Sequence, residues 1–332
     1  MAAAPQGKGI RDPEGCPRGT PGTEGDKGRG GHRSLKPPLI LFLLFFLLPS
    51  PLWGQAYPYR MPDCRCPCPG RDTVIGVIRQ YRVEEKDTLL DIARRFDLGF
   101  NEMRLLYPEL DPWLPPEGMV LQIPTRWVLP EFRGEGIVIN VPELRLYLFL
   151  PKIGLVKTHP VGIGVEENPT PLGTFKVVEK KVNPTWHIPP SLQGEYGGRG
   201  AIPPGPDNPL GRYWIGLSAE SYGIHGTNSP WGIGRLVSHG CIRLYPEDIE
   251  GLFPLVKRGM TVKLAYEPVK FGCERGRIFV EVHPDIYGKF GDLFSFALAL
   301  ARDKGILPHL SLPLLFKAVR ERRGIPVDIT KR

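Results

Sequence analysis

The sequence lacks long apolar runs and long blocks of like charge. One apolar run of ten residues, LILFLLFFLL from Leu39 to Leu48, falls well short of the roughly 20 residues that a membrane-spanning helix needs. The net charge is +8, and no basic block is long enough to predict a nucleic-acid-binding tail. With 41% hydrophobic and 23% charged residues, the composition is that of an ordinary globular protein without a nucleic-acid partner.

The apolar run has the flanks of an export signal. Arg33 and Lys36 precede it, and small residues at Gly54 and Ala56 follow it. A basic flank, a short apolar run and small residues before a cleavage point are typical of a secretory signal. The pattern predicts that residues 1–56 are a signal peptide cut after Ala56, or else an uncleaved N-terminal anchor. In both cases the rest of the chain is expected to be exported.

Cysteine is scarce, with six in the chain and five after the predicted signal. Outside the cytoplasm an odd count leaves at least one thiol unpaired or paired elsewhere. Cys64, Cys66 and Cys68 crowd into DCRCPCPG and predict a local disulfide or no bond at all. A zinc site is disfavoured there, because their spacing does not match the usual CxxC. Cys241 and Cys273 stand alone in the sequence.

Residues 57–78 are expected to form a linker, and residues 79–125 are expected to form a compact unit that follows it. Within this unit, Thr88 and Asp91 have the spacing of a helix capping box. The apolar residues from position 89 to 96 recur at the spacing of one helix face. A second short helix capped by Asn101 and a strand at each end complete a strand–helix–helix–strand order.

This order, together with the segments KDTLLDIARRF, LYPELDPW and GMVLQIP, resembles a LysM module. The resemblance covers the whole unit. It implies binding to the N-acetylglucosamine-containing glycan strands of peptidoglycan. The alternative is a small packing domain without a ligand.

Residues 135–266 are rich in short segments with the pattern of β-strands. GIVINV, LRLYLFL, GTFKVVEKKV, YWIGL and MTVKLAY are separated by turns and loops rich in proline and glycine. Many short strands with little helix predict a mainly β fold, a sandwich or barrel, preceded by the small α+β unit. A connector at residues 126–134 joins the two. Residues 267–332 form a C-terminal appendage, whose apolar residues at helical spacing predict packing rather than a binding site.

One cysteine in the β-rich region has the neighbours that a nucleophile needs. Cys241 lies in VSHGCIRLYP, and His225 lies upstream in YGIHGTNSP at the end of a predicted strand. A cysteine acyltransferase needs a thiolate, a base and amide donors for the oxyanion. Gly240 lets the backbone approach an intermediate closely, and Arg243 either binds a carboxylate or lowers the thiol pKa. His239 is expected to shape the pocket rather than to move protons.

The stretch YGIHGTNSPWGIGRLVSHGCIRLYPEDI resembles the catalytic motif of the YkuD-type L,D-transpeptidases. ENPTPLGTFKV and GPDNPLG are similar to other segments of that family, and the resemblance as a whole is to its exported Gram-negative branch. It implies that Cys241 is the nucleophile and that His225 is its proton acceptor and donor, oriented by the carbonyl of Gly226. The same resemblance assigns the oxyanion and substrate pocket to Ser238, His239, Gly240 and Arg243.

The implied chemistry requires no metal and no cofactor. Cys241 attacks the amide carbonyl at the L-centre of the diamino acid in a peptidoglycan tetrapeptide stem, and D-alanine leaves behind a thioester. An amine of a second stem then gives a cross-link, and an amine of an outer-membrane lipoprotein gives an anchor. Water as acceptor would make the protein an L,D-carboxypeptidase. The family also implies acylation by carbapenem-type β-lactams.

Two further alternatives are weaker. A catalytically inactive peptidoglycan-binding wall protein is disfavoured because His225 and Cys241 are both intact. A zinc site of His225, His239 and Cys241 would need a fourth ligand or a water. The expected location is the periplasm, either free or anchored to the inner membrane.

Three positions near the motif have other expected roles or none. Asp207 and Asn208, in GPDNPLG, are expected to hold a loop. Tyr245 precedes a helix expected to follow Pro246, where a polar cap would serve better, and the sequence offers no account of it.

Overall fold

The structure is a computed structural model, and it describes residues 55–59 and 72–332. These residues belong to one compact unit, Pro49–Arg332. The apolar run of the predicted signal and the cysteine cluster Cys64, Cys66 and Cys68 lie outside the described residues. Within the described ranges, none of the helices combines the length and the apolar character needed to cross a membrane.

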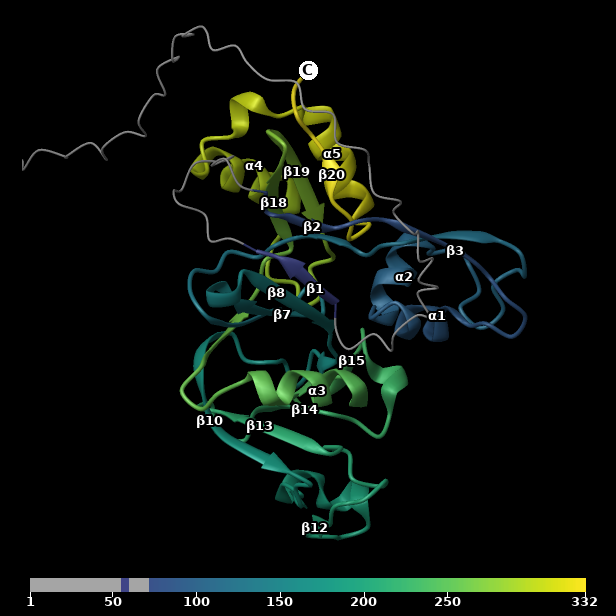
Figure 1. Cartoon of the computed structure of the whole chain (residues 1–332), viewed down its shortest axis with the longest axis vertical. Coiled ribbons are helices and arrows are strands. Elements are labelled where there is room, and N and C mark those ends of the chain that lie inside the picture. The colour runs from purple at the N-terminus through teal and green to yellow at the C-terminus, as the bar shows by residue number, and fades with distance from the viewer. Residues whose placement is uncertain (1–54, 60–71) are drawn as a thin grey trace, which may run out of the picture. The chain divides into compact units, whose positions relative to one another are not determined.

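The centre of the described chain is a mixed sheet of nine strands (Figure 1), which confirms the mainly β expectation. In spatial order the strands are β1 (Gln55–Pro58), β8 (Leu155–Pro160), β7 (Arg145–Leu150), β6 (Gly136–Asn140), β17 (Thr261–Ala265), β10 (Gly173–Val182), β13 (Tyr213–Leu217), β14 (Gly223–His225) and β16 (Ile242–Arg243). β6 runs parallel to β17 and β14 runs parallel to β16, whereas the other neighbours are antiparallel.

β10 pairs with two different neighbours along its length. Residues 173–176 pair with β17, and the part from Val177 to Val182 pairs with β13, past an irregularity between Val177 and Glu179. A bulge bends its strand. The two halves of the sheet enclose one apolar core, to which β6, β7 and β17 contribute from one half and β13, β14 and β16 from the other. The expected sandwich or barrel therefore takes the form of one folded sheet.

Residues 79–125 have the predicted order of elements. They are β3 (Arg79–Arg82), α1 (Leu89–Arg95), α2 (Phe100–Leu106) and β4 (Val120–Ile123), with β3 and β4 paired. Thr88 and Asp91 form the predicted capping box: the Thr88 hydroxyl accepts from the amide of Asp91, whose carboxylate accepts from the amide of Thr88. Asn101 is not the cap of α2. Gly99 is, and its amide donates to the Glu102 carboxylate at 2.8 Å.

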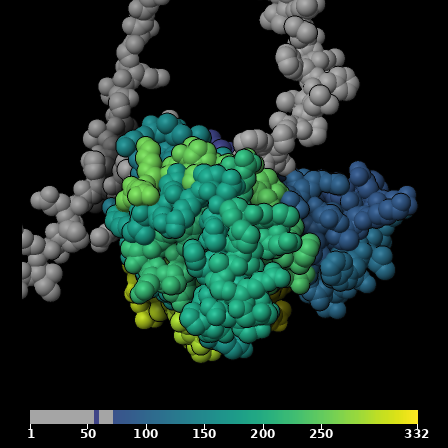
Figure 2. Space-filling model, turned by 90° about the horizontal axis from the view of Figure 1, so that it is seen from below, coloured from purple at the N-terminus to yellow at the C-terminus, as the bar shows by residue number. Residues whose placement is uncertain are grey.

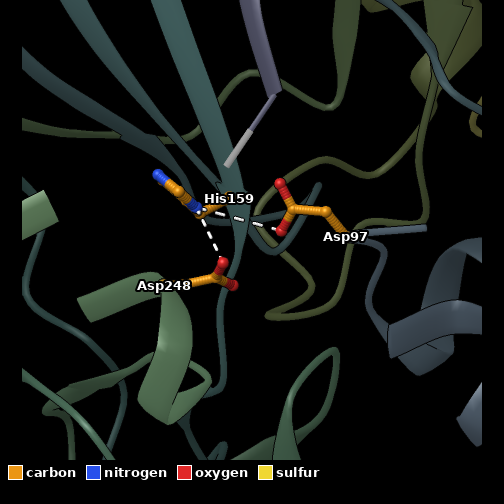
Figure 3. Close-up of side chains that lie close together, drawn as sticks. All are labelled: Asp97, His159 and Asp248. Atoms are coloured by element: carbon orange, nitrogen blue, oxygen red, sulfur yellow. Dashed lines mark ion pairs between the residues drawn. The ribbon is translucent and has the colours of Figure 1, made fainter. Parts of the chain in front are cut away.

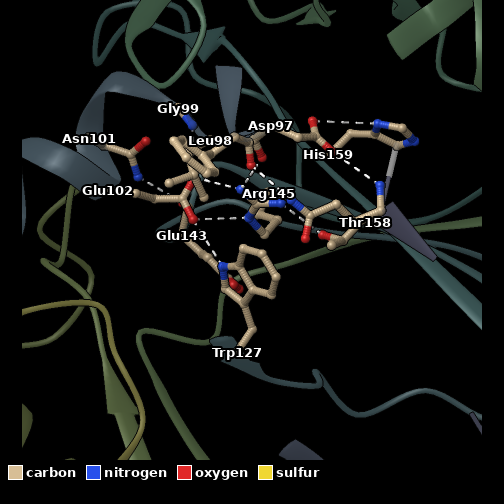
Figure 4. A network of polar contacts seen from close by, with 12 residues as sticks. Asp97, Leu98, Gly99, Asn101, Glu102, Trp127, Glu143, Arg145, Thr158 and His159 are labelled. Atoms are coloured by element: carbon tan, nitrogen blue, oxygen red, sulfur yellow. Dashed lines mark hydrogen bonds and ion pairs between the residues drawn. The ribbon is translucent and has the colours of Figure 1, made fainter. Parts of the chain in front are cut away.

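A buried polar network joins this unit to the main sheet (Figure 4). The guanidinium of Arg145 on β7 donates to both carboxylate oxygens of Glu102, at 3.1 and 2.6 Å. It also donates to the hydroxyl of Thr158 and to the backbone carbonyl of Asp97. The indole N–H of Trp127 donates to the same Glu102 carboxylate. Because these buried groups are paired with one another, the network holds α2 and the turn after α1 against β7 and β8.

Strands occupy both ends of the predicted linker at residues 57–78. β1 pairs with β8, and β2 (Val74–Gly76) pairs with β5 (Arg126–Val128) inside the predicted connector. The cleavage point predicted after Ala56 would fall within β1, where Ala56 lies opposite Lys157. Local composition missed these strands because their partners lie far along the chain.

The C-terminal appendage has its own apolar core, as its helical spacing predicted. It contains β18 (Val269–Glu274), β19 (Arg277–Val282), α4 (Leu293–Asp303), α5 (Leu312–Glu321) and β20 (Val327–Asp328), and Figure 1 shows the two helices beside β18 and β19. Cys273 on β18 is disulfide-bonded, which corrects its reading as a lone cysteine. The remaining short elements are β9 (Ile163–Gly164), β11 (Trp186–His187), β12 (Ala201–Ile202), β15 (Leu236–Ser238) and α3 (Pro246–Leu252).

Candidate active site

Cys241 and His225 come from neighbouring strands at one edge of the main sheet. In the parallel pair of β14 and β16, Ile224 lies opposite Ile242 and His225 lies opposite Arg243. Cys241 directly precedes β16. Since side chains two residues apart on a strand point to the same face, Cys241 and Arg243 project from the face that also carries His225. The structure thus gathers the predicted thiol, imidazole and guanidinium.

The imidazole of His225 is buried and held by a backbone group. Its Nδ1 lies 2.7 Å from the carbonyl oxygen of Gly226. A carbonyl oxygen can only accept, so Nδ1 carries the proton and Nε2 keeps its lone pair. The ring stacks on Trp214, with ring centroids 5.7 Å apart. Burial, together with the charge of Arg243, lowers the pKa of His225 to about 3, so the imidazole is neutral at pH 7.

The thiol of Cys241 is partly exposed, and it is the free cysteine of the described residues. It donates to the carbonyl oxygen of Ser221, in the turn between β13 and β14, at 3.6 Å. Burial raises the pKa of the Cys241 thiol, although a backbone hydrogen bond from Gly223 and the charge of Arg243 act to lower it. The sequence predicted the sign of the Arg243 effect, but burial outweighs it. The resting pair at neutral pH is a thiol and a neutral imidazole.

One hydroxyl closes the loop from Ser238 to Cys241. The Ser238 Oγ donates to the carbonyl oxygen of Cys241 at 2.6 Å and accepts from the amide of Gly240 at 3.1 Å. Gly240 has a φ of +102°, and a Cβ there would lie 2.4 Å from the Tyr222 ring, so the position requires glycine. His239 is exposed. Within the described part of the chain, the amides of His239 and Cys241 donate to no protein acceptor, which leaves two N–H groups for an oxyanion.

Arg243 supplies positive charge beside the thiol. Its backbone amide and carbonyl both pair with Gly162. Its Nε is buried without a hydrogen-bond partner. The Arg243 side chain as a whole is partly exposed, and a guanidinium next to a reactive group is suited to a substrate carboxylate.

A supporting layer behind the nucleophile loop was missed by sequence reasoning. The Thr170 hydroxyl donates to the carbonyl of Gly240 and accepts from the amide of Gly164, both at 3.0 Å. The Tyr287 hydroxyl, from the C-terminal appendage, donates to the carbonyl of Gly164 at 2.7 Å and accepts from the amide of Thr170 at 3.2 Å. The segment ENPTPLG, which contains Thr170, was the one available signal. Nothing local marks Tyr287.

The side chains of Asn208 and Tyr245, which lie near the motif, make defined contacts in the structure. Asn208 holds its loop as predicted, since its Nδ2 donates to the carbonyl of Pro184 and its Oδ1 accepts from the amide of Leu210. Tyr245 precedes α3 but makes no side-chain cap. Its buried hydroxyl donates to the carbonyl of Leu98 at 3.2 Å, so the residue ties the start of α3 to the turn after α1.

Two groups of described residues bring three possible metal ligands close together, and neither contains Cys241 or His225. One group is Asp97, His159 and Asp248, and the other is Glu143, Glu281 and His283. The alternative zinc site of His225, His239 and Cys241 is therefore not among the groups that the described residues form.

Comparisons with known proteins converge on one kind of enzyme. Residues 134–264 match the YkuD family model, described as an L,D-transpeptidase catalytic domain. The chain is 34% identical over 286 residues to the probable L,D-transpeptidase YcfS of Escherichia coli (strain K12), a match that covers 79% of this chain and 87% of that protein. It is 37% identical over 250 residues to the probable L,D-transpeptidase YbiS of the same strain, covering 71% and 81%. The probable L,D-transpeptidase ErfK/SrfK of that strain is 41% identical over 198 residues, covering 58% of this chain and 64% of that protein.

Proposed function

The chain belongs to the YkuD-type L,D-transpeptidases and acts on peptidoglycan, and we propose that it does so with Cys241 as nucleophile and His225 as proton carrier. The parallel pairing of β14 and β16 carries this assignment. It sets a free thiol, an imidazole with an unprotonated Nε2 and the guanidinium of Arg243 on one face of the sheet. The residues between the two strands supply the turn that presents the thiol.

The acylation step follows from these protonation states. Nε2 of His225 takes the thiol proton as Sγ of Cys241 bonds to the amide carbonyl carbon at the L-centre of the diamino acid. The carbon–nitrogen bond to the terminal D-alanine then breaks, His225 returns the proton to the departing amine, and a thioester remains. Because thiol and imidazole are both neutral at rest, the proton moves during the attack rather than before it.

The second half-reaction reverses the roles. The amine of an acceptor attacks the thioester carbonyl, and His225 accepts a proton from that amine. The new amide forms as the carbon–sulfur bond breaks, and the proton returns to Sγ of Cys241. Two half-reactions through one covalent intermediate predict ping-pong kinetics.

The loop around the thiol supplies the remaining groups. The free amides of His239 and Cys241 stabilise the negative charge that develops on the carbonyl oxygen. Ser238 shapes this loop rather than donating to the oxyanion, because its hydroxyl hydrogen is already given to the Cys241 carbonyl. The partly exposed guanidinium of Arg243 receives a carboxylate of the stem peptide.

Residues 79–125 serve as the glycan-binding LysM module in this proposal. A groove lies between this unit and the segment around position 230 of the catalytic domain. Figure 2 shows the blue surface of the unit against the green surface of that domain. Trp113 from the module and Trp231 from the catalytic side both line it and are 59% and 65% exposed. Asp91 and Arg94 add polar groups. Exposed indole faces beside polar groups are suited to sugar rings, which have apolar faces and hydroxyl edges.

The proposed setting is the periplasm, reached through the N-terminal segment, with the amine of a second stem as acceptor. The resulting product is a cross-link between two stems. A lipoprotein amine would give an anchored protein instead, and water would give an L,D-carboxypeptidase. The catalytic groups are the same in all three cases.

Mass spectrometry of the full-length protein with purified tetrapeptide muropeptides tests the proposal. We expect a cross-linked dimer, released D-alanine and, after rapid quenching, a protein adduct with the mass of the acylated stem. All three should vanish in Cys241→Ala, whose circular dichroism should match the wild type. Activity retained in Cys241→Ala would refute the nucleophile. Release of D-alanine without a dimer would replace transpeptidation by hydrolysis.

The glycan-binding part has a separate test. Trp113→Ala should lower co-sedimentation of the protein with isolated peptidoglycan sacculi. Phe316→Ala is the matched control, because Phe316 is an aromatic residue on α5 that is 51% exposed and does not line the groove. Equal binding of the two variants would refute the role of the groove.

A further inference from the structure

Two buried groups of carboxylates and histidine lie outside the active site, and they differ at their centres. In the first, Lys270 supplies the cation: its Nζ lies 2.7 Å from the Glu143 carboxylate and 2.9 Å from the Glu281 carboxylate. His283 contacts the same Glu281 at 2.6 Å. In this group a lysine cation lies between the two carboxylates.

The second group, Asp97, His159 and Asp248, is called the Asp–His–Asp cluster here (Figure 3). Asp97 follows α1, His159 is on β8 and Asp248 is in the first turn of α3, so three distant segments converge. Nδ1 of His159 lies 3.2 Å from the Asp248 carboxylate and 3.8 Å from the Asp97 carboxylate. The three side chains are 4%, 0% and 2% exposed.

The polar atoms of this cluster lack ordinary partners. Oδ1 of Asp97, Oδ2 of Asp248 and both ring nitrogens of His159 are buried without a hydrogen bond. Among the described residues, no lysine or arginine side chain pairs with either carboxylate. The nearby Arg145 donates to the backbone carbonyl of Asp97 instead. Without a metal, the ring of His159 is the cation that faces both carboxylates, and a divalent ion that displaces the ring proton supplies two positive charges in place of one.

The spacing of the cluster fits a bound ion. Around a tetrahedral zinc with bonds of about 2.0–2.2 Å, neighbouring ligand atoms lie roughly 3.3–3.6 Å apart. The separations of 3.2 and 3.8 Å from the ring nitrogen bracket that range, and one ligand atom from each residue lies within 4.8 Å of the others.

We propose that Asp97, His159 and Asp248 form a structural site for a divalent transition-metal ion of the zinc class. Two carboxylates, a neutral imidazole and one divalent cation sum to zero charge, which suits full burial. The ion ties the turn after α1 to β8 and to α3. α3 follows the nucleophile strand β16 directly, so the ion also fixes the module beside the catalytic face. The inference does not depend on the roles proposed for Cys241 and His225.

Metal analysis of the full-length protein tests this site. Protein stripped with a chelator, loaded with zinc chloride at pH 7.5 and desalted should retain about one zinc per chain. Zinc present at about 100 times its dissociation constant should raise Tm by roughly 5 °C or more. X-ray absorption should show nitrogen and oxygen neighbours at about 2.0–2.2 Å and no sulfur at about 2.3 Å. Folded wild type that retains no zinc, or a spectrum with sulfur, would overturn the proposal.

Matched variants locate the ion. His159→Gln should lose the zinc and the rise in Tm, whereas His283→Gln should keep both, because Lys270 already occupies the centre of the other group. Zinc content equal to that of the wild type in His159→Gln would also overturn the proposal. If His159→Gln does not fold, Asp248→Asn and the wild-type absorption spectrum decide the question.

Discussion

His225 and His159 are both buried, yet their surroundings favour opposite charges. Around His225, burial and the charge of Arg243 lower its pKa to about 3. Around His159, burial alone would lower the pKa, but the carboxylates of Asp248 and Asp97 raise it to about 9. Burial acts in the same direction on both rings, so the neighbouring charges make the difference: Arg243 adds to the effect of burial at His225, whereas the carboxylates of Asp248 and Asp97 outweigh it at His159.

The comparison separates two ways of placing polar groups. At the active site, His225 and Cys241 contact backbone carbonyls and stay neutral, so a proton can pass between them. In the body of the molecule, Arg145 with Glu102, and Lys270 with Glu143, are fixed as ion pairs. Substitutions at the active site should therefore reduce activity, and substitutions in the ion-paired groups should reduce stability.

The largest expected effect is that of His225→Gln on turnover. Loss of the proton acceptor should lower kcat by about 10²- to 10⁴-fold. The melting temperature should change little, because no ion pair is broken. Dimer formation followed by mass spectrometry measures the rate, and circular dichroism measures the melt. His187→Gln, an exposed histidine on β11, is the control and should keep full activity. Wild-type turnover in His225→Gln would refute the role of His225 as the proton acceptor.

Lys270→Met should have the opposite effect and reduce stability without reducing turnover. It leaves the buried carboxylates of Glu143 and Glu281 without their cation and should lower the free energy of unfolding by about 3–5 kcal/mol. Turnover per folded molecule should stay near the wild-type value. Urea unfolding provides the measurement. Lys263→Met, which breaks the more exposed pair with Glu267, should cost only about 0–1 kcal/mol. Equal losses in the two variants would contradict the view that burial sets the size of the effect.

The pH dependence of thiol alkylation tests the neutral pair. Since burial raises the pKa of Cys241 and the His225 imidazole is neutral above about pH 3, the thiolate is scarce at pH 7. The rate of iodoacetamide modification should rise about tenfold per pH unit between pH 6 and 9, because only the thiolate reacts. A plateau between pH 5 and 7 would instead indicate a thiolate–imidazolium pair.

The lowered pKa of His225 also affects the stability of the fold. His225 binds a proton in the unfolded chain below about pH 6.5 but in the folded chain only below about pH 3. The unfolded state therefore gains protons first as the pH falls through this window. His225 should lower the free energy of unfolding progressively from pH 6.5 toward pH 3, and it should have no effect above pH 6.5.

The smallest expected effect is that of Thr170→Val, which tests the layer behind the nucleophile. It leaves the Gly240 carbonyl and the Gly164 amide without their partner, which should cost about 1–3 kcal/mol of stability and several-fold in kcat. Thr174→Val, at an exposed position of β10, is the control. If the two variants have the same kcat, Thr170 has no positioning role.

Local patterns predicted the local parts of the fold well. The capping box of Thr88 and Asp91 and the β4 strand are where the sequence placed them, because each depends on residues close together in the chain. Pairings between distant segments were not predicted. β1 and β2 were taken for linker, since their partners β8 and β5 lie far along the chain.

The residues of the candidate site likewise fall into those that local sequence could indicate and those that only long-range contacts bring to the site. His225, Ser238, Gly240, Cys241 and Arg243 could be named as candidates because they lie in one short stretch whose residue types match a chemical need. Thr170 could have been found from its family-like segment. Tyr287 could not, because its only link to the loop is a contact made in the folded state.

The sequence by itself determined which thiol and which imidazole are available and the motif that surrounds them. Only the tertiary structure decided their charge states, because burial and the position of Arg243 set the pKa of each group. It likewise decided that Asp97, His159 and Asp248 meet. Each of these three residues is unremarkable among its sequence neighbours, and their shared negative potential exists only where three distant segments are packed together.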